Sequence, residues 1–373
     1  MQTCDVVIIG AGMAGASAAA LLAEHMQVLV LEAESYPGYH TTGRSAATFI
    51  ENYGPPSVRA MTRASRDFLR APPEGFTDGP LLGERGLIYA ASACELDALD
   101  EELAAATGME RLTAEECTRL VPALAGGPLS AAGYEPGAQD MDVDRIHQGF
   151  LRMLKRRGGE LKCDVRVQAV ARCDGLWHVS DSTQTYGAPV LVNAGGAWGD
   201  VVAGLAGVAS LGLQPMRRSV AIVEVSGAVA VDPAWPLVAG VAGNWYCKPE
   251  QNWLLVSPAD ESPSEPCDAY PEDLDLALGI DRMQQMLQFD VKRMHRSWAG
   301  LRTFAPDRLL VNGFDPLHDG FYWLVGQGGY GIQTGPAMAT VAACNISGST
   351  PSQGVLDAGV DIAALSPARF TAR

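Results

Sequence analysis

Three glycines near the amino terminus have the spacing of a dinucleotide-binding turn, Gly-x-Gly-x-x-Gly. They are Gly10, Gly12 and Gly15, and an acidic residue, Glu32, follows them at the distance typical of this motif. Gly10 permits a tight turn, Gly12 lets the backbone approach a pyrophosphate, and Gly15 lets a helix pack closely on a strand. The helix amino terminus offers N–H donors to the diphosphate, and Glu32 can accept hydrogen bonds from ribose hydroxyls. The motif predicts a bound dinucleotide without distinguishing NAD from FAD.

The elements that must position these residues are a strand, a helix and a second strand. Residues 6–9 and 28–32 are apolar runs typical of buried parallel strands, and residues 14–24 suit a close-packed helix. The uncharged run over 6–23 has about the length of a membrane span, but glycines interrupt it and no basic segment precedes it. The sequence therefore predicts a βαβ unit in a cytoplasmic protein rather than a membrane span or a signal peptide.

The succession of strand, glycine turn and helix recurs at residues 191–200 and 320–346. Three such junctions far apart in sequence predict one discontinuous domain. The intervening stretches, around 75–140 and 215–298, are richer in polar, Pro and aromatic residues and contain alternating runs such as 219–225. They predict an antiparallel sheet with covering helices.

Composition restricts the classes of function. The chain has 373 residues, 47% of them hydrophobic, which is enough for two domains with sizeable cores. A formal net charge of −16 and the lack of any basic run argue against binding of nucleic acid or an anionic membrane. Eight cysteines without CxxC pairs indicate neither a metal site nor a disulfide framework.

Five separated motifs give the chain a resemblance to a known family. Together they look like the D-amino-acid-oxidase-type FAD-dependent oxidoreductases, and the loop at 37–47 with the segment at 211–219 most resembles the bacterial D-arginine dehydrogenases. The motifs are the amino-terminal glycine turn, "PGYHTTGRSAA" (37–47), "VLVNAGGAWGD" (190–200), "WAGLRTF" (298–304) and "GQGGYGIQT" (326–334).

The resemblance implies an α/β plus α+β fold, in which a Rossmann-type FAD-binding domain is combined with a discontinuous substrate domain built on an antiparallel sheet. The FAD-binding domain would comprise residues 1–75, 141–214 and 299–373. The substrate-binding domain would comprise residues 76–140 and 215–298. No cysteine or histidine follows Arg302 closely, so we expect the FAD to be noncovalent.

The resemblance also assigns residues to the cofactor. His40 to Ala47 would line the flavin ring, with Ser45 near its reactive N5 edge, and Val167, in a strand-like run, would contact adenine. The turn at 328–333 and the helix after it would face the pyrimidine oxygen, where a reduced flavin carries negative charge. The predicted cofactor-binding residues are Gly10, Gly12, Ala14, Gly15, Glu32, Ala33, Thr41, Thr42, Gly43, Arg44, Ser45, Ala46, Ala47, Thr48, Val167, Gly195, Gly328, Gly329, Tyr330, Gly331, Ile332 and Gln333.

The resemblance implies a small-molecule substrate, an amino acid or an amine. Arg218, rather than its neighbour Arg217, and Arg302 would hold a carboxylate in bidentate fashion. A lid over residues 49–53 would carry one of two active-site tyrosines. The predicted substrate residues are Tyr53, Leu87, Arg218, Tyr246, Arg302 and Gly329, and the predicted catalytic residues are Tyr53, Tyr246, Arg218, Arg302 and Thr48. Hydride transfer from Cα to flavin N5 would give an imine, which water hydrolyses to a keto acid.

Two positions depart from the D-arginine dehydrogenases. Thr48 stands where those enzymes have a histidine near the substrate amine, and Leu87 stands where they have a glutamate that holds the guanidinium. A buried leucine would leave a guanidinium unpaired, so D-arginine is expected to be a poor substrate. Glu84 or Glu51 is an alternative source of the missing acid.

The electron acceptor and the reaction class stay open at this point. Family oxidases commonly place a lysine over the flavin, and here only Lys248 lies near the corresponding strand, which favours a dehydrogenase. Alternatives are an oxidase of an N-substituted or specialised secondary-metabolism amino acid, a catalytically silent flavoprotein module, and an NAD-linked dehydrogenase. The sequence does not give the oligomeric state.

Overall fold

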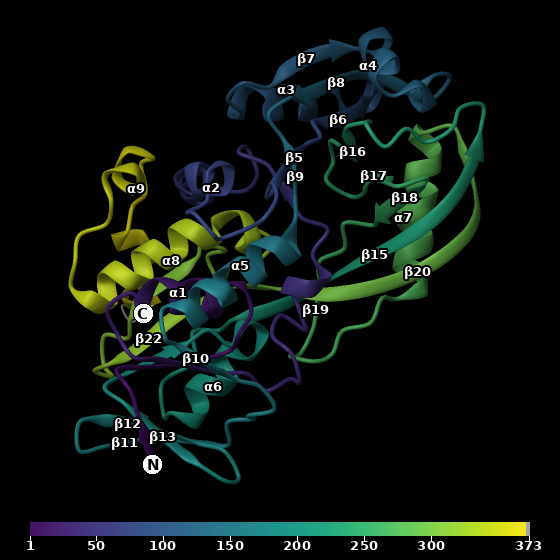
Figure 1. Cartoon of the computed structure of the whole chain (residues 1–373). Coiled ribbons are helices and arrows are strands. Elements are labelled where there is room, and N and C mark those ends of the chain that lie inside the picture. The colour runs from purple at the N-terminus through teal and green to yellow at the C-terminus, as the bar shows by residue number, and fades with distance from the viewer. Residues whose placement is uncertain (371–373) are drawn as a thin grey trace.

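The computed structural model describes residues 1–370, and Figure 1 shows two lobes that are joined by a pair of long strands. The helices are α1 (Met13–Leu22), α2 (Pro56–Arg70), α3 (Leu96–Ala105), α4 (Ala114–Leu120), α5 (Val143–Arg156), α6 (Gly199–Leu205), α7 (Asp273–Met286), α8 (Gly331–Ser347) and α9 (Gln353–Asp357). The strands are β1 (Gln2–Thr3), β2 (Val6–Ile9), β3 (Val28–Leu31), β4 (Thr48–Phe49), β5 (Leu82–Glu84), β6 (Leu87–Ser92), β7 (Glu110–Thr113), β8 (Leu129–Glu135), β9 (Gln139–Met141), β10 (Glu160–Lys162), β11 (Ala169–Cys173), β12 (Leu176–Ser180), β13 (Thr185–Ala188), β14 (Val190–Asn193), β15 (Gln214–Gly227), β16 (Leu237–Gly240), β17 (Tyr246–Glu250), β18 (Trp253–Ser257), β19 (Ser262–Pro263), β20 (Phe289–Phe304), β21 (Val311–Phe314) and β22 (Phe321–Val325).

A six-stranded sheet in the order β10-β3-β2-β14-β22-β21 forms the centre of the first lobe. Its strands are parallel except for the edge strand β21, and β2, β3 and β22 are buried along their whole length. The three predicted junctions leave the sheet from β2, β14 and β22, which are adjacent strands. Their turns therefore meet at one edge, at the carboxyl ends of the strands, where ligands bind in open parallel sheets.

Helices α1, α5 and α8 cover one face of this sheet (Figure 1). Helix α1 can lie close to β2 because Gly15 has no side chain: a Cβ atom there would overlap the carbonyl oxygen of Gly10. A small antiparallel meander of β11, β12 and β13, extended by β1, lies beside the other face, where Trp177 and Trp323 share one core.

The second lobe is a nine-stranded, mostly antiparallel sheet that contains β19, β15, β18, β17, β16, β6, β8, β7 and β20. Strands β15 and β20 pair over their whole length and run from one lobe to the other (Figure 1). Side chains alternate between the two faces of a sheet. Ile88, Val238, Cys247 and Ala221 accordingly face a core shared with α7, whereas Leu87 and its same-face neighbours face the first lobe.

A three-stranded sheet, β4-β9-β5, lies over the face that points toward the first lobe. A buried ion pair attaches it there: Lys248 of β17 donates from Nζ to Oδ1 of Asp140 in β9 at 2.8 Å. Arg85 donates from Nε to the other carboxylate oxygen of Asp140 at 2.7 Å. One carboxylate thus holds two cations and fixes the distance between the two sheets.

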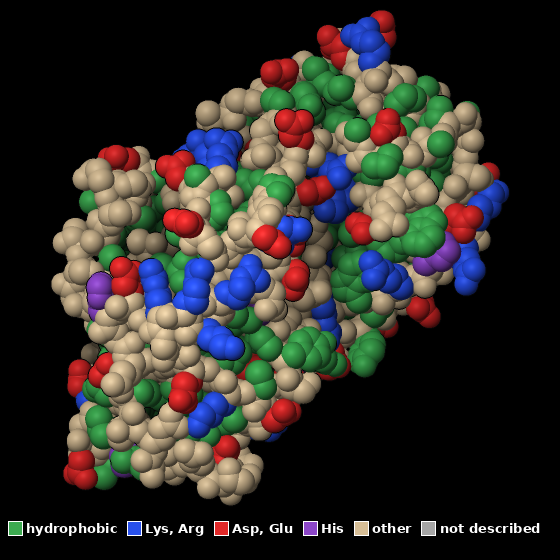
Figure 2. Space-filling model, viewed as in Figure 1, with side chains coloured by type: hydrophobic (Ala, Val, Ile, Leu, Met, Phe, Trp, Pro, Cys, Tyr) green, Lys and Arg blue, Asp and Glu red, His purple; other side chains and the backbone are tan. Residues whose placement is uncertain are grey.

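Charged side chains of both signs are spread over the surface that Figure 2 shows. Lys and Arg gather at the level of α5, whose basic residues include Arg145, Arg152 and Lys155. Arg145 is paired with Asp142 and Asp78, so part of this positive charge is neutralised locally. Within residues 1–370, no helix is long and apolar enough to cross a membrane, and no group of His, Cys, Asp and Glu has the arrangement of a metal site.

The predicted fold class is confirmed, because a parallel sheet with glycine turns is combined with an antiparallel sheet that comes from interleaved parts of the chain. The predicted domain boundaries stay a prediction. The strand expected around Val167 is wrong: residues 163–168 have no regular structure, and β11 begins at Ala169.

Replacement of Asp140 tests the attachment of the three-stranded sheet. Asp140→Ala leaves Lys248 buried without a partner, and we expect it to lower the free energy of unfolding in urea by about 2–4 kcal/mol. The loss is smaller than for a fully enclosed pair because 27% of the Asp140 side chain is exposed. Asp78→Ala, which removes an exposed carboxylate from Arg145, is the matched control and should cost about 1 kcal/mol or less. Equal losses in the two variants would contradict this interpretation.

Candidate active site

A cavity of about 780 Å³ extends from the glycine turn of β2 to the face of the nine-stranded sheet. All three strand–turn–helix junctions contribute to its wall, and so does the stretch from Gly38 to Thr48. The cavity therefore has a nucleotide end, over the parallel sheet, and a second end between the two sheets.

The turn after β2 has the geometry of a cradle for a phosphate group. Gly10 has a φ of +101°, and a Cβ atom on it would lie 2.5 Å from the carbonyl oxygen of Ala194, so only glycine fits. The N–H of Met13 donates to Oγ1 of Thr42 at 3.0 Å, whereas Ala14 on the wall keeps the free N–H of a first helical turn. These features fit a diphosphate at the amino terminus of α1.

Glu32 is placed for a ribose at the end of β3. Its Oε2 accepts from the N–H of Ala11 at 2.8 Å and its Oε1 from the N–H of Glu34 at 3.0 Å. Each carboxylate oxygen keeps a second acceptor site, and Glu32, Ala33 and Val167 line the cavity together. The residues present thus fit the adenosine half of FAD.

His147 supports this turn from behind, and sequence reasoning missed it. It donates from Nε2 to the carbonyl oxygen of Ala11 at 2.8 Å, and its ring packs against Gly38, where a Cβ atom would lie 2.9 Å from Cε1. Burial lowers the pKa of His147, although the bond to Ala11 opposes this, so the ring is neutral at neutral pH. A lone histidine in a helix gives no sequence signal of such a contact.

The stretch expected at the flavin ring is tied to the nine-stranded sheet. Thr41 donates from Oγ1 to the carbonyl oxygen of Leu301 at 2.7 Å. Arg44 turns its guanidinium away from the cavity, toward the carbonyl oxygens of Ala269 and Ala299 and the carboxylate of Asp268. The guanidinium of Arg44 therefore holds the loop in place, and only the other atoms of this residue line the cavity wall.

The structure brings nearly all predicted site residues to one wall. The exceptions are Gly15 and Gly43, which lie behind it and allow close backbone packing: a Cβ atom on Gly43 would be 2.8 Å from the oxygen of Gly38. The predicted residues on the wall are Gly10, Gly12, Ala14, Glu32, Ala33, Thr41, Thr42, Arg44, Ser45, Ala46, Ala47, Thr48, Tyr53, Leu87, Val167, Gly195, Arg218, Tyr246, Arg302, Gly328, Gly329, Tyr330, Gly331, Ile332 and Gln333.

Side chains alternate between the two faces of each strand, and this explains which of them reach the second end of the cavity. Arg218 and Arg302 lie on the inward face of β15 and β20, where Arg218 pairs with Gly300 and Arg302 with Met216. Tyr246 of β17 and Ala239 of β16 continue this face as a cross-strand pair. The sheet thus presents two cations and a tyrosine to the same space.

Arg302 is a cation without a carboxylate partner in residues 1–370. Its guanidinium contacts Tyr53, to whose hydroxyl oxygen it donates from Nη1 at 3.2 Å. Gly329 lets the turn before α8 approach it, since a Cβ atom there would lie 2.9 Å from Nη1. Burial and the positive charge of Arg302 lower the pKa of Arg218. Burial raises the pKa of Tyr53, but Arg302 and Arg218 outweigh it and the net shift is downward.

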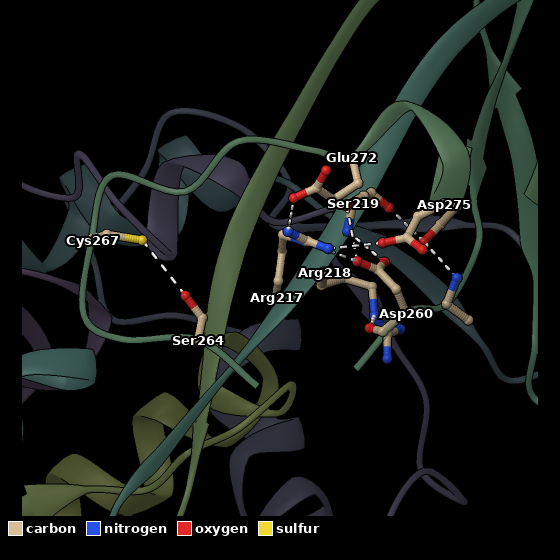
Figure 3. Close-up of polar contacts among 10 residues, drawn as sticks. Arg217, Arg218, Ser219, Asp260, Ser264, Cys267, Glu272 and Asp275 are labelled. Carbon is tan, nitrogen blue, oxygen red and sulfur yellow. Dashed lines mark hydrogen bonds and ion pairs between the residues drawn. The ribbon is translucent and has the colours of Figure 1, made fainter. Parts of the chain in front are cut away.

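A polar network on β15 orients Arg218 (Figure 3). The backbone oxygen of Asp260 accepts from Nε of Arg218 at 2.7 Å, and Glu261 accepts from Nη2 at 3.3 Å. Arg217 points to the opposite face, where it pairs with Asp275 of α7 and with Glu272, the N-cap residue of that helix. The prediction of Arg218 over Arg217 at the cavity agrees with this placement, and Glu261, which lines the cavity, is a residue that sequence reasoning missed.

The segment expected to be a lid is held at both of its sides. Gln333 of α8 accepts from the N–H of Ile50 and donates to its carbonyl oxygen. Glu135 of β8 accepts from the N–H groups of Glu51 and Asn52 through Oε1. Phe49 is fully buried in the core. The lid interpretation is therefore wrong for Phe49, and Tyr53 is carried by a fixed turn.

The alternative acids and Lys248 lie off the cavity. Glu84 is exposed, and Glu51 pairs with Arg66. Lys248, the lysine nearest to the strand where family oxidases place one, is buried against Asp140 and does not line the cavity. Leu87 does line the cavity, as predicted, and is 1% exposed.

Comparisons with known proteins agree with this geometry. Residues 5–344 match a protein family described as "DAO: FAD dependent oxidoreductase". The FAD-dependent oxidoreductase domain-containing protein 1 of Mus musculus is 24% identical over 400 residues, which cover 92% of this chain and 81% of the mouse protein.

Two solved structures share the fold. Glycine oxidase from Geobacillus kaustophilus superposes with a TM-score of 0.83 at 22% identity, covering 98% of both chains. L-proline dehydrogenase from P. horikoshii superposes with a TM-score of 0.82 at 19% identity, covering 99% of this chain and 98% of that chain. At these identities the likeness concerns the fold.

Glu135 supports the turn that carries Tyr53, and the strength of this support depends on pH. Burial raises the pKa of this carboxyl, and the hydrogen bonds from Asn52 and Glu51 offset burial only in part. The folded protein then holds the proton to higher pH than the unfolded chain does. The contribution of Glu135 to stability is therefore lost as pH rises from the ordinary Glu range through the raised pKa.

Replacement of Glu135 tests this support. Glu135→Gln keeps an acceptor without charge, and we expect it to be more stable than the parent at pH 8, with a difference that shrinks toward pH 5.5. Urea unfolding across this range measures it, with exposed Glu74→Gln as control. A difference that does not change with pH would refute the assignment.

Proposed function

The chain belongs to the family of FAD-dependent oxidoreductases, and on that premise we propose that it oxidises the Cα–N bond of an amino acid or related amine. The product would be an imine, which water hydrolyses to a keto acid. Three further points are proposals as well. They are a close relation to the D-arginine dehydrogenases, the stereochemistry of the substrate and the noncovalent attachment of FAD. The enzyme would be a dehydrogenase or an oxidase.

One observation carries the proposal, namely that the guanidinium of Arg302 faces the cavity without a carboxylate partner in the described chain. A buried cation without a counter-ion is costly, and a protein tolerates it where a ligand supplies the negative charge. Arg218 adds a second positive charge nearby, and burial together with the charge of Arg302 lowers the pKa of Arg218. An anion between the two would relieve their repulsion, and a guanidinium binds a carboxylate in bidentate geometry.

The chain's own groups then orient the substrate. Arg302 and Arg218 would hold the carboxylate, and the hydroxyls of Tyr53 and Tyr246 would donate to it while their rings exclude water. Thr48 lines the same space and keeps its hydroxyl free within residues 1–370. Bound FAD supplies the acceptor of the hydride. Such orientation by fixed groups is worth several orders of magnitude in rate.

Proton transfer needs no dedicated base in this arrangement. Glu261 is the carboxylate on the wall near Arg218, and its two oxygens are engaged by Arg218 and Arg308. We therefore propose that the amine enters in its neutral form. The protein then has no proton to remove from the amine before hydride transfer.

Replacement of Arg302 tests the proposal. Purified protein is mixed anaerobically with a library of D- and L-amino acids and N-substituted amino acids, and loss of the visible flavin absorbance is followed. We expect Arg302→Lys to retain flavin but to lower kcat/KM by about 100-fold or more, because an ammonium ion cannot replace the bidentate contact. Arg293→Lys, an exposed change on the same strand, should leave kcat/KM unchanged. Failure of every amine in the library to reduce the flavin of the parent would overturn the proposal.

Substrate binding should weaken at alkaline pH through Tyr53. Because the pKa of Tyr53 lies below its usual value, its phenolate forms before that of an ordinary tyrosine as pH rises. The phenolate would neutralise Arg302 and remove a donor, so the KM should increase above that pH. In Tyr53→Phe the KM should be higher at neutral pH and should lack this alkaline increase. Tyr36→Phe, at the surface, serves as the control, and an unchanged alkaline limb in Tyr53→Phe would contradict the assignment.

A further inference from the structure

The cavity continues past Tyr246 into an arm between the nine-stranded sheet and the three-stranded sheet. On the basis of the proposed function, which places the substrate carboxylate at Arg302, we infer that this arm takes a neutral, mainly apolar side chain of at least leucine size, with any polar atom directed at Tyr89. The inference concerns a substrate class that neither the family nor the fold determines.

Apolar side chains form the floor and the roof of the arm. Leu87 and Leu237 are register partners on β6 and β16, as are Tyr89 and Ala239, and all four face the cavity. Ile50 joins the same apolar cluster. Met141 of β9 and Thr48 of β4 complete the roof. A small side chain such as that of glycine would leave these walls without an apolar partner, so the free energy of binding should improve as apolar area is added.

No charged side chain of the described chain reaches the wall of this arm. The charged residues on the cavity wall lie at the nucleotide end or at the carboxylate end, and they are Glu32, Glu34, His40, Arg44, Arg166, Arg218, Glu261 and Arg302. Strands β6, β16 and β17 contribute Leu87, Tyr89, Leu237, Ala239, Gly240 and Tyr246 instead. A charged side chain would therefore be desolvated without a partner.

The nearest acid does not change this conclusion. Glu135 lies directly across from Leu87 on β8, but it is 4% exposed, does not line the cavity, and holds the N–H groups of Glu51 and Asn52. Lys248 and Asp140 face the same layer and neutralise each other. A cationic or anionic substrate side chain thus finds no counter-ion without rearrangement of the turn that carries Tyr53.

Tyr89 marks the far end of the arm. Its hydroxyl forms no hydrogen bond within residues 1–370, although the side chain lies on the wall. Burial and the charges of Glu102 and Glu135 raise the pKa of Tyr89, so the hydroxyl stays neutral and can donate or accept. Two strand spacings, or about 10 Å, separate the strand of Tyr246 from that of Tyr89. A leucyl or phenylalanyl side chain enters this space, and a para-hydroxyl can approach Tyr89.

The test compares side chains at constant backbone chemistry. The holoenzyme is given both enantiomers of alanine, leucine, phenylalanine, tyrosine, glutamate, lysine and arginine, together with glycine, and anaerobic flavin reduction gives the specificity for each. We expect leucine, phenylalanine or tyrosine to exceed glutamate, lysine and arginine on the order of 100-fold in one enantiomeric series. Glycine or a charged amino acid as the best substrate would overturn the inference and leave the proposed function intact.

A binding measurement separates this inference from turnover. Acetate, 4-methylpentanoate, 3-phenylpropanoate and glutarate carry the carboxylate without an amine, and each is titrated while the flavin absorbance spectrum is followed. Affinity should rise at least about 10-fold from acetate to 3-phenylpropanoate and should fall for glutarate. Equal affinity for all four would refute the apolar arm, and absence of binding by any of them would refute the carboxylate site as well.

Single substitutions locate the effect within the arm. Tyr89→Phe should abolish any preference for tyrosine over phenylalanine, a change of about 3- to 10-fold, and should leave leucine unaffected. Leu87→Ala should raise the KM for leucine and phenylalanine more than that for alanine. Tyr134→Phe, whose ring is on the opposite face of the sheet from Tyr89, and Leu129→Ala, in the other core, are the matched controls. The same response in the controls as in the arm variants would overturn the placement.

Discussion

The pairing of β15 with β20 is the constraint on which the rest of the site depends. Because these two strands run through both lobes and keep one register from Gln214 to Ile222, alternation along this part decides which side chains face the cavity and which face α7. Arg218 and Arg217 are neighbours in sequence, yet one lies at the proposed carboxylate site and the other among acidic residues of a helix. A register shift by one residue would exchange them.

A second layer of contacts converts this face into an enclosed site. The carboxylate of Asp140 holds Lys248 and Arg85, which sets the height of the roof above the sheet. Gln333 and Glu135 fix the turn of Tyr53 from the two lobes. Most charges near the second end of the cavity are thus satisfied by the protein itself. Arg302 has no carboxylate partner among the described residues, and this contrast supports the proposed ligand site at Arg302.

Local patterns in the sequence predict the parallel half of the fold well, because strand, glycine turn and helix are adjacent in the chain and their chemistry is short-range. Gly10, Gly12 and Glu32 could be assigned in this way, whereas Arg302 and Tyr246 needed a family resemblance. Tyr89, Glu261 and His147 were missed because their positions depend on pairing between distant strands and on packing. The same limit explains the error at Phe49, whose burial depends on the core around it. It also explains why the sequence did not reveal the partner of Lys248, which is Asp140, more than a hundred residues away.

The continuity of β15 and β20 has a consequence for how molecules enter and leave. Two lobes that share a pair of long strands are not joined by a flexible linker, because rotation of one lobe against the other would have to break hydrogen bonds of the ladder, which is regular from Gln214 to Ile222. Reactant, product and displaced water would then enter and leave through rotation of individual side chains around the cavity. Exchange with solvent would then depend on local side-chain rotations rather than on domain opening.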